Sequence, residues 1–306
     1  MENEYKISRY SSIHIKKLKL LYAASYGRKR SLKYFQYRLH ENPFGKAIAY
    51  VMKYNDILVG FYAITPIKLN IDQKSTLGGY SFLSMTHPDH SKKGIFQKLA
   101  KKTFEEAKKQ KYNFILGFAN KTSFPIFTKK LNFKHIFPLN HLEIKIDPNS
   151  SFSLKMSKTN RHPDKLWNNY NSKNELIFIE KNNNYIQWRF KNTLYQYYIF
   201  SSKNEYFVYK KFDNTLHILD FFGTESEQFY ENLLDVANVL LKKLDCEKIT
   251  LWIPKNHNLL KSSKIIKKKK LHTDSFFIIK ILNKKISSNV SKIDNWYYSM
   301  SDSDVF

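Results

Sequence analysis

One stretch of this sequence constrains the fold more than any other: an apolar run, a basic turn and an amphipathic helical pattern that follow one another without a break. The apolar run, residues 80–85, comes after two glycines and predicts a buried strand. After the turn, residues 86–96, apolar side chains recur at helical spacing, so a helix begins near Gly94. The N–H groups of such a turn converge, and the helix dipole adds positive charge. The stretch predicts a phosphate-binding loop; the alternative is an ordinary strand-to-helix turn.

Composition sets the size and class of the protein. The chain has 306 residues, 42% hydrophobic and 16% aromatic, which can fill the cores of one large or two ordinary domains. The single cysteine, Cys246, allows neither an internal disulfide nor a cysteine-rich zinc site, which favours a reducing cytoplasm. The first residues show no basic and apolar leader, and no apolar run approaches the ~20 residues of a membrane span. We therefore expect a cytoplasmic protein with no membrane span.

The formal net charge of +26 has two interpretations. One is an anionic partner, such as nucleic acid, an acidic carrier protein, a phosphorylated substrate or an anionic membrane surface. The other is compositional, because lysine, asparagine, isoleucine, phenylalanine and tyrosine are abundant together, as in proteins of AT-rich genomes. We favour the second for most of the lysines, since no nucleic-acid-binding module is visible. Nucleic acid is therefore not an expected partner.

The periodicities predict two similar series of elements. The first series has strands at 4–10, 47–53, 57–64, 79–86, 112–118 and 135–146, with helices at 15–26, 31–41, 94–107 and 120–130. The second has strands at 195–201, 205–211, 215–222, 248–253 and 273–282, with helices at 226–243 and from 256.

A short repeat supports a duplication. Residues 34–39, Y-F-Q-Y-R-L, are echoed by residues 185–190, Y-I-Q-W-R-F, and the elements that follow have a similar order. The second half differs where its helix begins, because residues 223–227, G-T-E-S-E, are acidic where the first half is basic. An acidic loop repels phosphate, so we expect one nucleotide site, in the first half.

The basic turn carries a family resemblance. Residues 86–96, T-H-P-D-H-S-K-K-G-I-F, resemble the pyrophosphate-binding loop of the GNAT family of acyl-CoA-dependent N-acyltransferases, often written V-H-P-E-Y-R-G-K-G-I-G. Gly94 and Ile95 match that pattern. Three residues depart from it: Ser91 stands where Arg or Gln is usual, and Lys92 and Phe96 each stand where Gly is usual.

Further similarity follows along the chain. Residues 116–121, L-G-F-A-N-K, and 130–133, K-L-N-F, are similar to the family's next strand, Asn-led helix and closing K-L-G-F. The resemblance covers roughly residues 1–147, whereas 160–282 share it only through the repeat and the element order.

The resemblance implies a site for coenzyme A. Backbone N–H groups of the loop would cradle the pyrophosphate, with lysine charge beside them; these residues are Ser91, Lys92, Lys93, Gly94, Ile95 and Phe96. Met85 and Thr86, at the end of the preceding strand, would pair with the pantetheine arm. Asn120 would contact that arm through its side-chain amide.

The implied chemistry is attack of an amine on a thioester, which needs a base, oxyanion donors and an acid for the thiolate. Many family members place a Tyr acid where Thr128 stands here, so the usual acid is missing; Tyr80 and Tyr112 are alternatives. His87 and His90 flank the loop at the phosphate end, where a structural role is expected.

The last residues, 294–306, are aromatic and then acidic. They are either a frayed terminus or a functional tail. In two tandem-GNAT families, the N-myristoyltransferases and the enhanced-intracellular-survival aminoglycoside acetyltransferases, the terminal carboxylate serves as the base. We therefore expect the tail to return to the first half, with Asp302, Asp304 or the carboxylate of Phe306 as the base.

The expected fold is α/β, with two tandem GNAT-like mixed β-sheets flanked by helices. The expected parts are an acyl-CoA-binding domain at 1–147, a linker at 148–160, a degenerate GNAT-like domain at 161–283 and a tail at 284–306. We expect an N-acetyltransferase that uses acetyl-CoA, and no metal, to acetylate a small amine, with an amino sugar of a surface glycan pathway as first choice. The alternatives are transfer from an acidic acyl carrier protein or an aminoacyl-tRNA, and a non-catalytic relic that binds CoA or nucleic acid.

Overall fold

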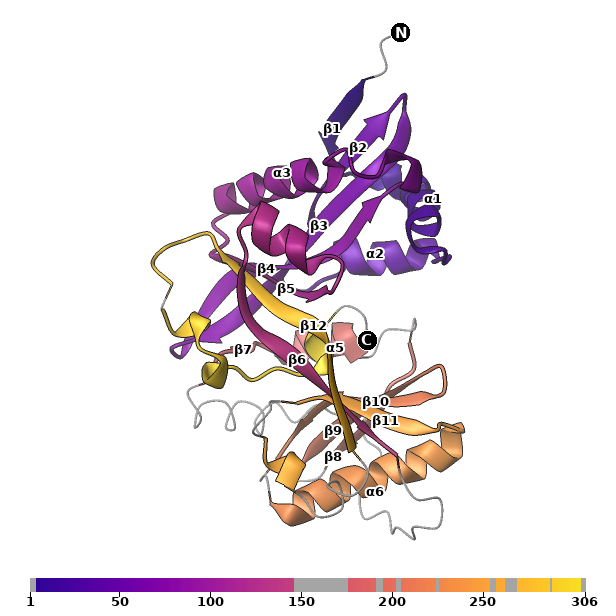
Figure 1. Ribbon diagram of the computed structural model, residues 1–306, viewed down its shortest axis with the longest axis vertical. Coiled ribbons are helices and arrows are strands. Elements are labelled where there is room, and N and C mark those ends of the chain that lie inside the picture. Colours follow the sequence, from indigo (N-terminus) through magenta and orange to yellow (C-terminus); the bar gives the residue numbers. More distant parts are fainter. Residues whose placement is uncertain are drawn as a thin grey trace. The chain divides into compact units, whose positions relative to one another are not determined.

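The computed structural model describes residues 4–145, 176–190, 195–201, 205–223, 226–253, 257–261, 269–286 and 288–303 (Figure 1). The predicted linker, 148–160, lies outside the described residues. No helix in the described part of the chain is long and apolar enough to cross a membrane. The cytoplasmic location stays a prediction.

The chain forms two compact units. Unit 1 comprises Met1–Asn70, Lys74–Ile136 and Phe277–Ser288, and unit 2 comprises Ile71–Gln73, Phe137–Phe276 and Asn289–Phe306. The chain thus enters unit 2 before the expected boundary at 147, and residues 277–288 belong to unit 1 although they were expected in the second domain. Each unit is completed by a segment from the other half of the chain, which sequence periodicity alone does not reveal.

Unit 1 is a mixed sheet with helices. Its strands, in the order β1-β2-β3-β4-β5, are β1 (Tyr5–Arg9), β2 (Ile48–Tyr54), β3 (Ile57–Ile71), β4 (Lys74–Thr86) and β5 (Phe114–Asn120). The pairs β1–β2 and β2–β3 are antiparallel and β4–β5 is parallel. The helices are α1 (Ile15–Tyr26), α2 (Leu32–His40) and α3 (Ile95–Lys109). The last residues of β12 (Lys269–Ile281) lie next to β5.

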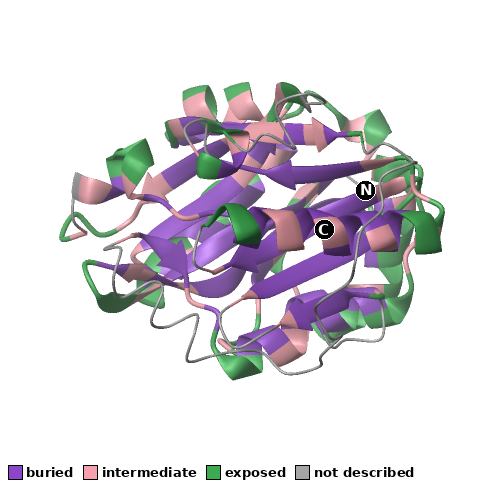
Figure 2. Ribbon diagram, turned by 90° about the horizontal axis from the view of Figure 1, so that it is seen from below, coloured by how far each residue is buried: buried purple, intermediate pink, exposed green. Residues whose placement is uncertain are grey.

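Unit 2 also contains strands of mixed direction. Its strands, in the order β6-β11-β10-β9-β8, are β6 (Lys134–Ile144), β11 (Lys248–Trp252), β10 (Thr215–Phe222), β9 (Tyr206–Phe212) and β8 (Tyr198–Ser201). The helices are α5 (Asn183–Phe190) and α6 (Glu227–Leu244), and a two-residue strand is β7 (Phe178–Ile179). The apolar face of α6 packs with these strands into one buried core. Figure 2 shows that the strands are largely buried and the turns exposed.

Short helical turns complete the fold. The 3₁₀ turns are Ser12–His14, Pro88–His90, Asn258–Lys261, Ser288–Ser291, Ile293–Asn295 and Met300–Asp302, and a π-helical turn spans Ile126–Lys130. The helix expected at 120–130 differs in two ways: Asn120 still belongs to β5, and residues 126–130 form a π-helical turn.

The two units repeat one series of elements. In unit 1 the order is α2, β2, β3, β4, α3, β5, and in unit 2 it is α5, β8, β9, β10, α6, β11. Both series end in a parallel strand pair, and both copies of the repeated six-residue pattern are helical. The matched order supports the duplication that the repeat predicts.

The hairpin of β3 and β4 is longer than the sequence indicated. The expected strands ended at 64 and began at 79, because Pro66 and several polar residues between them are typical of a loop. The structure instead continues both strands to a two-residue turn, in which Asp72 and Gln73 have φ of 49° and 61°. Ile67 and Leu69 are buried along this extension.

One glycine fixes the distance between α3 and the sheet. A Cβ atom on Gly60 of β3 would lie 2.4 Å from Cγ2 of Ile95, 3.0 Å from Cδ1 of Leu99 and 3.3 Å from Cβ of Met52. Ile95 is the first residue of α3, so the start of this helix rests directly on the backbone of β3.

We expect Gly60→Ala to push α3 away from the sheet and to lower the free energy of unfolding by about 1–3 kcal/mol, the usual cost of overpacking. Urea unfolding followed by circular dichroism measures this. The double variant Gly60→Ala with Ile95→Ala should destabilise less than the sum of its single variants. Full additivity would contradict this account of the contact.

Candidate functional site

The strands β4 and β5 stay paired over a short distance. In the described part of the chain, their parallel pairing comprises Gly79 with Ile115 and Tyr80 with Leu116, although β4 continues to Thr86. Beyond Tyr80 the backbone of β4 is irregular, because Leu83 has a φ of 49°, a value that non-glycine residues rarely adopt. Strained, separated strand ends of this kind leave main-chain groups available to an extended ligand.

The end of β4 is held from its other side. The hydroxyl of Tyr26 donates to the carbonyl of Ser84 at 2.8 Å, and that of Ser25 donates to the carbonyl of Thr86 at 3.2 Å. Met85 is buried and Thr86 is half-buried. The two residues predicted to meet the pantetheine arm therefore stand on a braced strand end.

The basic loop has the backbone of an anion-binding nest. His87 donates its N–H to the carbonyl of Val59 at 2.9 Å, which ties the loop to β3. Lys92 and Gly94 have φ of 61° and 71°, and α3 begins at Ile95. Left-handed residues next to a helix start turn successive N–H groups toward one point, and the first N–H groups of a helix have no partner within it. The predicted strand, loop and helix start are thus present, with Lys92 and Lys93 exposed.

His90 supports the loop from β1 and β2. Its Nδ1 lies 2.8 Å from the hydroxyl of Tyr5, and its ring lies 5.0 Å from the ring of Tyr54. Burial, together with Lys93 and His87, lowers the pKa of His90. These contacts give His90 the structural role expected for it.

Phe96 fills the space that the usual glycine would leave. Its ring centroid lies 5.4 Å from that of Tyr62 in β3 and 5.4 Å from that of Phe127 in the π-helical turn. The substitution therefore adds an aromatic contact beneath the loop.

Asn120 ends β5 and caps the next turn. Its Oδ1 accepts from the backbone N–H groups of Thr122 at 3.1 Å and Ser123 at 2.8 Å. Within the described ranges its Nδ2 makes no hydrogen bond, so this exposed amide is available as a donor.

Of the three candidates for the acid, one stands at the strand separation. Thr128 donates its hydroxyl to the carbonyl of Phe124 at 2.9 Å and so serves the π-helical turn. Tyr112 lies before β5, away from the end where the strands part, and burial raises its pKa to about 12. Tyr80 is the last paired residue of β4 and packs near Phe118.

The predicted tail, 284–306, is divided between the units: its described residues up to 288 belong to unit 1, and residues 289–303 belong to unit 2. Two of its aromatic residues, Trp296 and Tyr298, are each 5% exposed, and Tyr297 is half-buried. Asp304 and Phe306 lie outside the described residues, so their expected role as base stays a prediction.

Asp302 takes part in a buried charge network. The ammonium of Lys181 lies 2.8 Å from the carboxylate of Asp220 and 3.0 Å from that of Asp302. It also donates to Ser301 at 2.7 Å and Ser299 at 3.2 Å. Burial acts to lower the pKa of Lys181, but the two carboxylates outweigh it and raise the pKa. Burial likewise raises the pKa of Asp302, although Lys181 opposes it.

Arg189 of α5 holds the same segment. Its guanidinium donates to the carbonyls of Ser301 at 3.3 Å and Ser303 at 3.0 Å, and to the hydroxyl of Tyr197 at 2.9 Å. Arg189 is the second copy of the repeated arginine, whose first copy, Arg38, lies 5.2 Å from the ring of Phe82. The repeat revealed the arginine, but no sequence signal revealed its contacts with the tail.

Unit 2 contains a group of residues able to bind a metal. Ligand atoms of His141, His272 and Asp274 all lie within 4.8 Å of one another. However, Trp252 donates its indole N–H to Nε2 of His141 at 2.8 Å, and Nε2 of His272 lies 2.9 Å from the carboxylate of Asp274. A metal on either nitrogen would displace these contacts, so the group is built as a hydrogen-bonded cluster.

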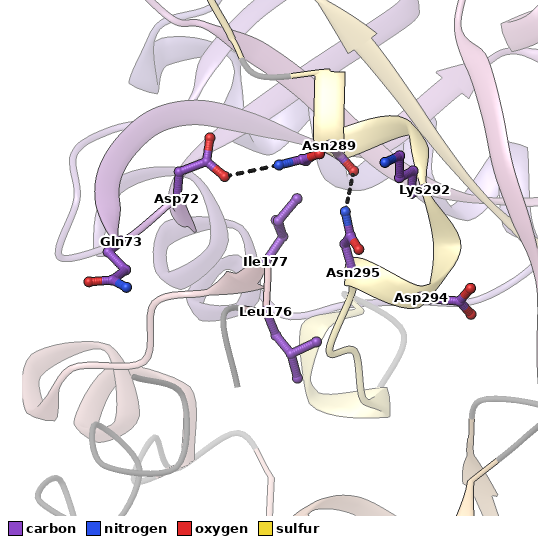
Figure 3. Close-up of a pocket in the computed structure, with 8 residues that line it drawn as sticks. All are labelled: Asp72, Gln73, Leu176, Ile177, Asn289, Lys292, Asp294 and Asn295. Carbon is purple, nitrogen blue, oxygen red and sulfur yellow. Dashed lines mark hydrogen bonds between the residues drawn. The ribbon is translucent and has the colours of Figure 1, made fainter. Parts of the chain in front are cut away.

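A polar pocket of about 460 Å³ also lies in unit 2 (Figure 3). Asp72, from the hairpin turn, accepts from Asn289 at 3.3 Å, and Asn295 donates to the carbonyl of Asn289 at 3.2 Å. The side chain of Ile177 forms an apolar wall. None of the predicted site residues lines this pocket.

With this geometry in place, the comparisons identify the first half. The family described as acetyltransferase (GNAT) domain matches residues 6–135. These residues are a GNAT acetyltransferase domain. The match contains the loop, the separated strands and Asn120, so the family resemblance and the expected α/β fold are confirmed. The match supports acetyltransferase chemistry of the GNAT type for this half of the chain.

Solved structures share the fold of the chain beyond the GNAT domain. A probable N-acyltransferase from Enterococcus faecalis has a TM-score of 0.70 at 9% identity, over 92% of this chain and 73% of that one. A putative acetyltransferase from Pyrococcus horikoshii has a TM-score of 0.65 at 15% identity, over 98% and 96%. The N-myristoyltransferase of Saccharomyces cerevisiae, solved with bound myristoyl-CoA, has a TM-score of 0.66 at 12% identity, over 97% and 85%. No curated protein matches the sequence.

We expect the double variant Lys92→Glu with Lys93→Glu to weaken CoA binding by about tenfold or more, because charge reversal opposes phosphate at the nest. Calorimetric titration with CoA measures this. The matched control, Lys16→Glu with Lys19→Glu, makes the same change in net charge on exposed positions of α1 and should leave affinity nearly unchanged. Equal losses in both variants would contradict a specific loop site.

We also expect acid to destabilise the protein through unit 2. Burial, with nearby cationic groups, lowers the pKa values of His141 and His217 to about 4 each. Both are neutral above pH ~6.5, and between that pH and about 4 the unfolded chain binds protons that the folded chain does not. Stability therefore falls over this window, by up to roughly 3 kcal/mol per histidine. Urea unfolding at a series of pH values measures the slope, which His217→Gln should reduce; an unchanged slope would contradict the assignment.

Proposed function

We propose that this GNAT protein transfers an acetyl group from acetyl-CoA to the primary amine of a small acceptor. The observation that carries the proposal is the nest at Lys92 and Gly94, directly beyond a strand pair that separates at Tyr80. The nest can bind the pyrophosphate of an acyl-CoA, and the open end of β4 can pair with its pantetheine arm. No metal is required for this chemistry.

The residues of unit 1 bind and orient the donor in this proposal. N–H groups of residues 91–96 bind the pyrophosphate, and Lys92 and Lys93 add charge. The main chain at Met85 and Thr86 pairs with the pantetheine arm, and Asn120 donates to it. The amine nitrogen attacks the thioester carbonyl, the C–S bond breaks, and the thiolate takes a proton for which Tyr80 is the nearest placed candidate.

The base is proposed to come from the end of the chain. Asp302 already has a cationic partner, so its carboxylate anchors the tail rather than deprotonating an amine. Asp304 and the terminal carboxylate of Phe306 remain as proposed bases. Of the three acidic groups expected as the base, two are therefore proposed.

The acceptor is proposed to be an amino sugar of a surface glycan pathway. An acidic acyl carrier protein is the second candidate donor, favoured by the net charge of +26. Transfer from acetyl-CoA and transfer from a carrier protein would differ in salt dependence, because a protein–protein contact between opposite charges weakens steeply as salt screens it.

The test is acetyl transfer by the purified full-length protein, measured as thiol release. The acceptors are a panel of amino sugars, amino acids and polyamines, and the donor is acetyl-CoA or acetyl carrier protein. We expect turnover of amino sugars with acetyl-CoA. Removal of residues 304–306 should lower kcat by about 10²-fold or more, the usual contribution of a general base, without loss of CoA binding.

The control for this truncation is Asp302→Asn, which should lower stability because it leaves Lys181 short of one carboxylate. Unchanged turnover after truncation would contradict the tail as the source of the base. CoA binding without turnover of any amine would instead indicate a relic of a transferase.

A further inference from the structure

A second pocket lies on unit 1, along the side of α3. Lys101, Phe104, Glu105 and Lys108 stand three, four and seven residues apart and so share one face of this helix. That face meets residues 130–132 and Lys280 of β12. Together these residues enclose about 240 Å³; we call this the lysine pocket, lined by Lys101, Phe104, Glu105, Lys108, Lys130, Leu131, Asn132 and Lys280.

The lysine pocket carries an excess of positive charge. Its lining contains four lysines and one acidic residue, Glu105, whose carboxylate also has Lys102 as a partner at 3.3 Å. In the part of the chain that the structure describes, the ammonium groups of Lys101, Lys108 and Lys130 make no hydrogen bond or ion pair. Like charges gathered in this way raise the free energy of the folded protein until an anion neutralises them.

Lys280 forms the inner end of the pocket. It donates to the carbonyl of Leu131 at 2.7 Å, and its ammonium lies 5.7 Å from the ring of Phe104 and 5.9 Å from that of Phe133. Burial, and then the charge of Lys108, lower the pKa of this half-buried lysine. A cation is thus kept partly out of water although it has no carboxylate partner among the described residues, which an incidental surface lysine would avoid.

Two simpler explanations cover only part of this arrangement. The negative end of the dipole of α3 attracts Lys108, but it does not account for Lys130 or Lys280, which lie on other elements. Solvation accounts for single exposed lysines such as Lys109 and Lys129, and neither of these lines the pocket. Lys101, Lys108 and Lys130 are exposed as well, but they line one hollow together with the half-buried Lys280. Neither explanation accounts for lysines from three different elements that line the same hollow.

We propose that the lysine pocket binds a small phosphomonoester. The ammonium groups hold the phosphate, and the small exposed edges of Phe104 and Leu131, which are 5% and 3% exposed, contact the organic part. The pocket differs from the nucleotide loop, since Lys101 and Lys108 stand about 9 and 20 Å along the helix from Ile95, at about 1.5 Å per residue. The inference goes beyond the proposed transfer reaction, because it adds a second ligand to the GNAT domain.

The experiment titrates the full-length protein with phenyl phosphate at constant ionic strength, by calorimetry, with CoA absent and with CoA in excess. We expect saturable binding in both cases, and weaker binding of inorganic phosphate, which lacks a ring. If CoA alone fails to bind, the nucleotide loop is wrong and the lysine pocket is still tested. If CoA abolishes binding of phenyl phosphate, the probe occupies the loop and the proposal is wrong.

The variants separate the pocket from the general charge of the protein. Lys108→Gln with Lys130→Gln should weaken phenyl phosphate binding by about tenfold or more, because two charged hydrogen bonds are lost. The matched control, Lys109→Gln with Lys129→Gln, removes the same charge from the neighbouring positions and should change affinity less than about twofold. Equal effects of the two variants, equal affinity for phenyl and inorganic phosphate, or no saturable binding would overturn the proposal.

Discussion

The functional geometry of unit 1 depends on the direct contact of α3 with β3. Because Gly60 has no side chain, Ile95 reaches the backbone of the sheet at the first residue of the helix. The loop between β4 and this helix passes through left-handed conformations at Lys92 and Gly94. Glycine adopts this conformation freely, but lysine does so at a cost, so the sequence accepts strain where it presents its N–H groups. Phe96 offsets part of this cost by packing beneath the loop.

Unit 2 uses a different constraint, a buried lysine between two aspartates. The side chains of Lys181 and Asp220 are each 1% exposed, and that of Asp302 is 3% exposed. Removing such charges from water is expensive, and an apolar core of the same volume is often as stable. The network fixes the position of the tail relative to Lys181, because a tail shifted by one residue would leave Lys181 buried without Asp302. The network and Arg189 together define where the chain stands at Ser303, three residues before its end.

The sequence predicted the elements that have a local signal. The strand, turn and helix around Gly94 are present because glycine placement, apolar spacing and turn residues all agree there. The hairpin between Ile64 and Gly79 was missed because Pro66 and polar residues mask an alternating pattern that only tertiary packing makes a strand. The π-helical turn around Thr128 likewise has no local signature.

Long-range features had no signal in one sequence. Lys181 and Asp302 are 121 residues apart in the chain (302 − 181), so pattern reasoning had no reason to pair them. The assignment of residues 277–288 to unit 1 is similar, because a strand carries the same alternation whichever sheet it completes. The candidate site shows the same division: its loop was predictable, whereas the strained Leu83 and the exposed amide of Asn120 depend on how β4 and β5 part.

The charge of the protein also divides into two kinds of lysine. Exposed lysines such as Lys109, which line no pocket described above, follow from composition. Lys92 and Lys93 at the nest, and Lys280 at the inner end of the lysine pocket, stand instead where backbone or neighbouring cations already make the potential positive. A chain selected only for solubility would disperse charge at such places. The start of α6 provides the contrast, since Ser226 caps that helix with its own hydroxyl and Glu227 follows, so the corresponding N–H groups in unit 2 are supplied with acceptors from within the chain. The start of α3 therefore has no side-chain cap, whereas the start of α6 is capped from within the chain.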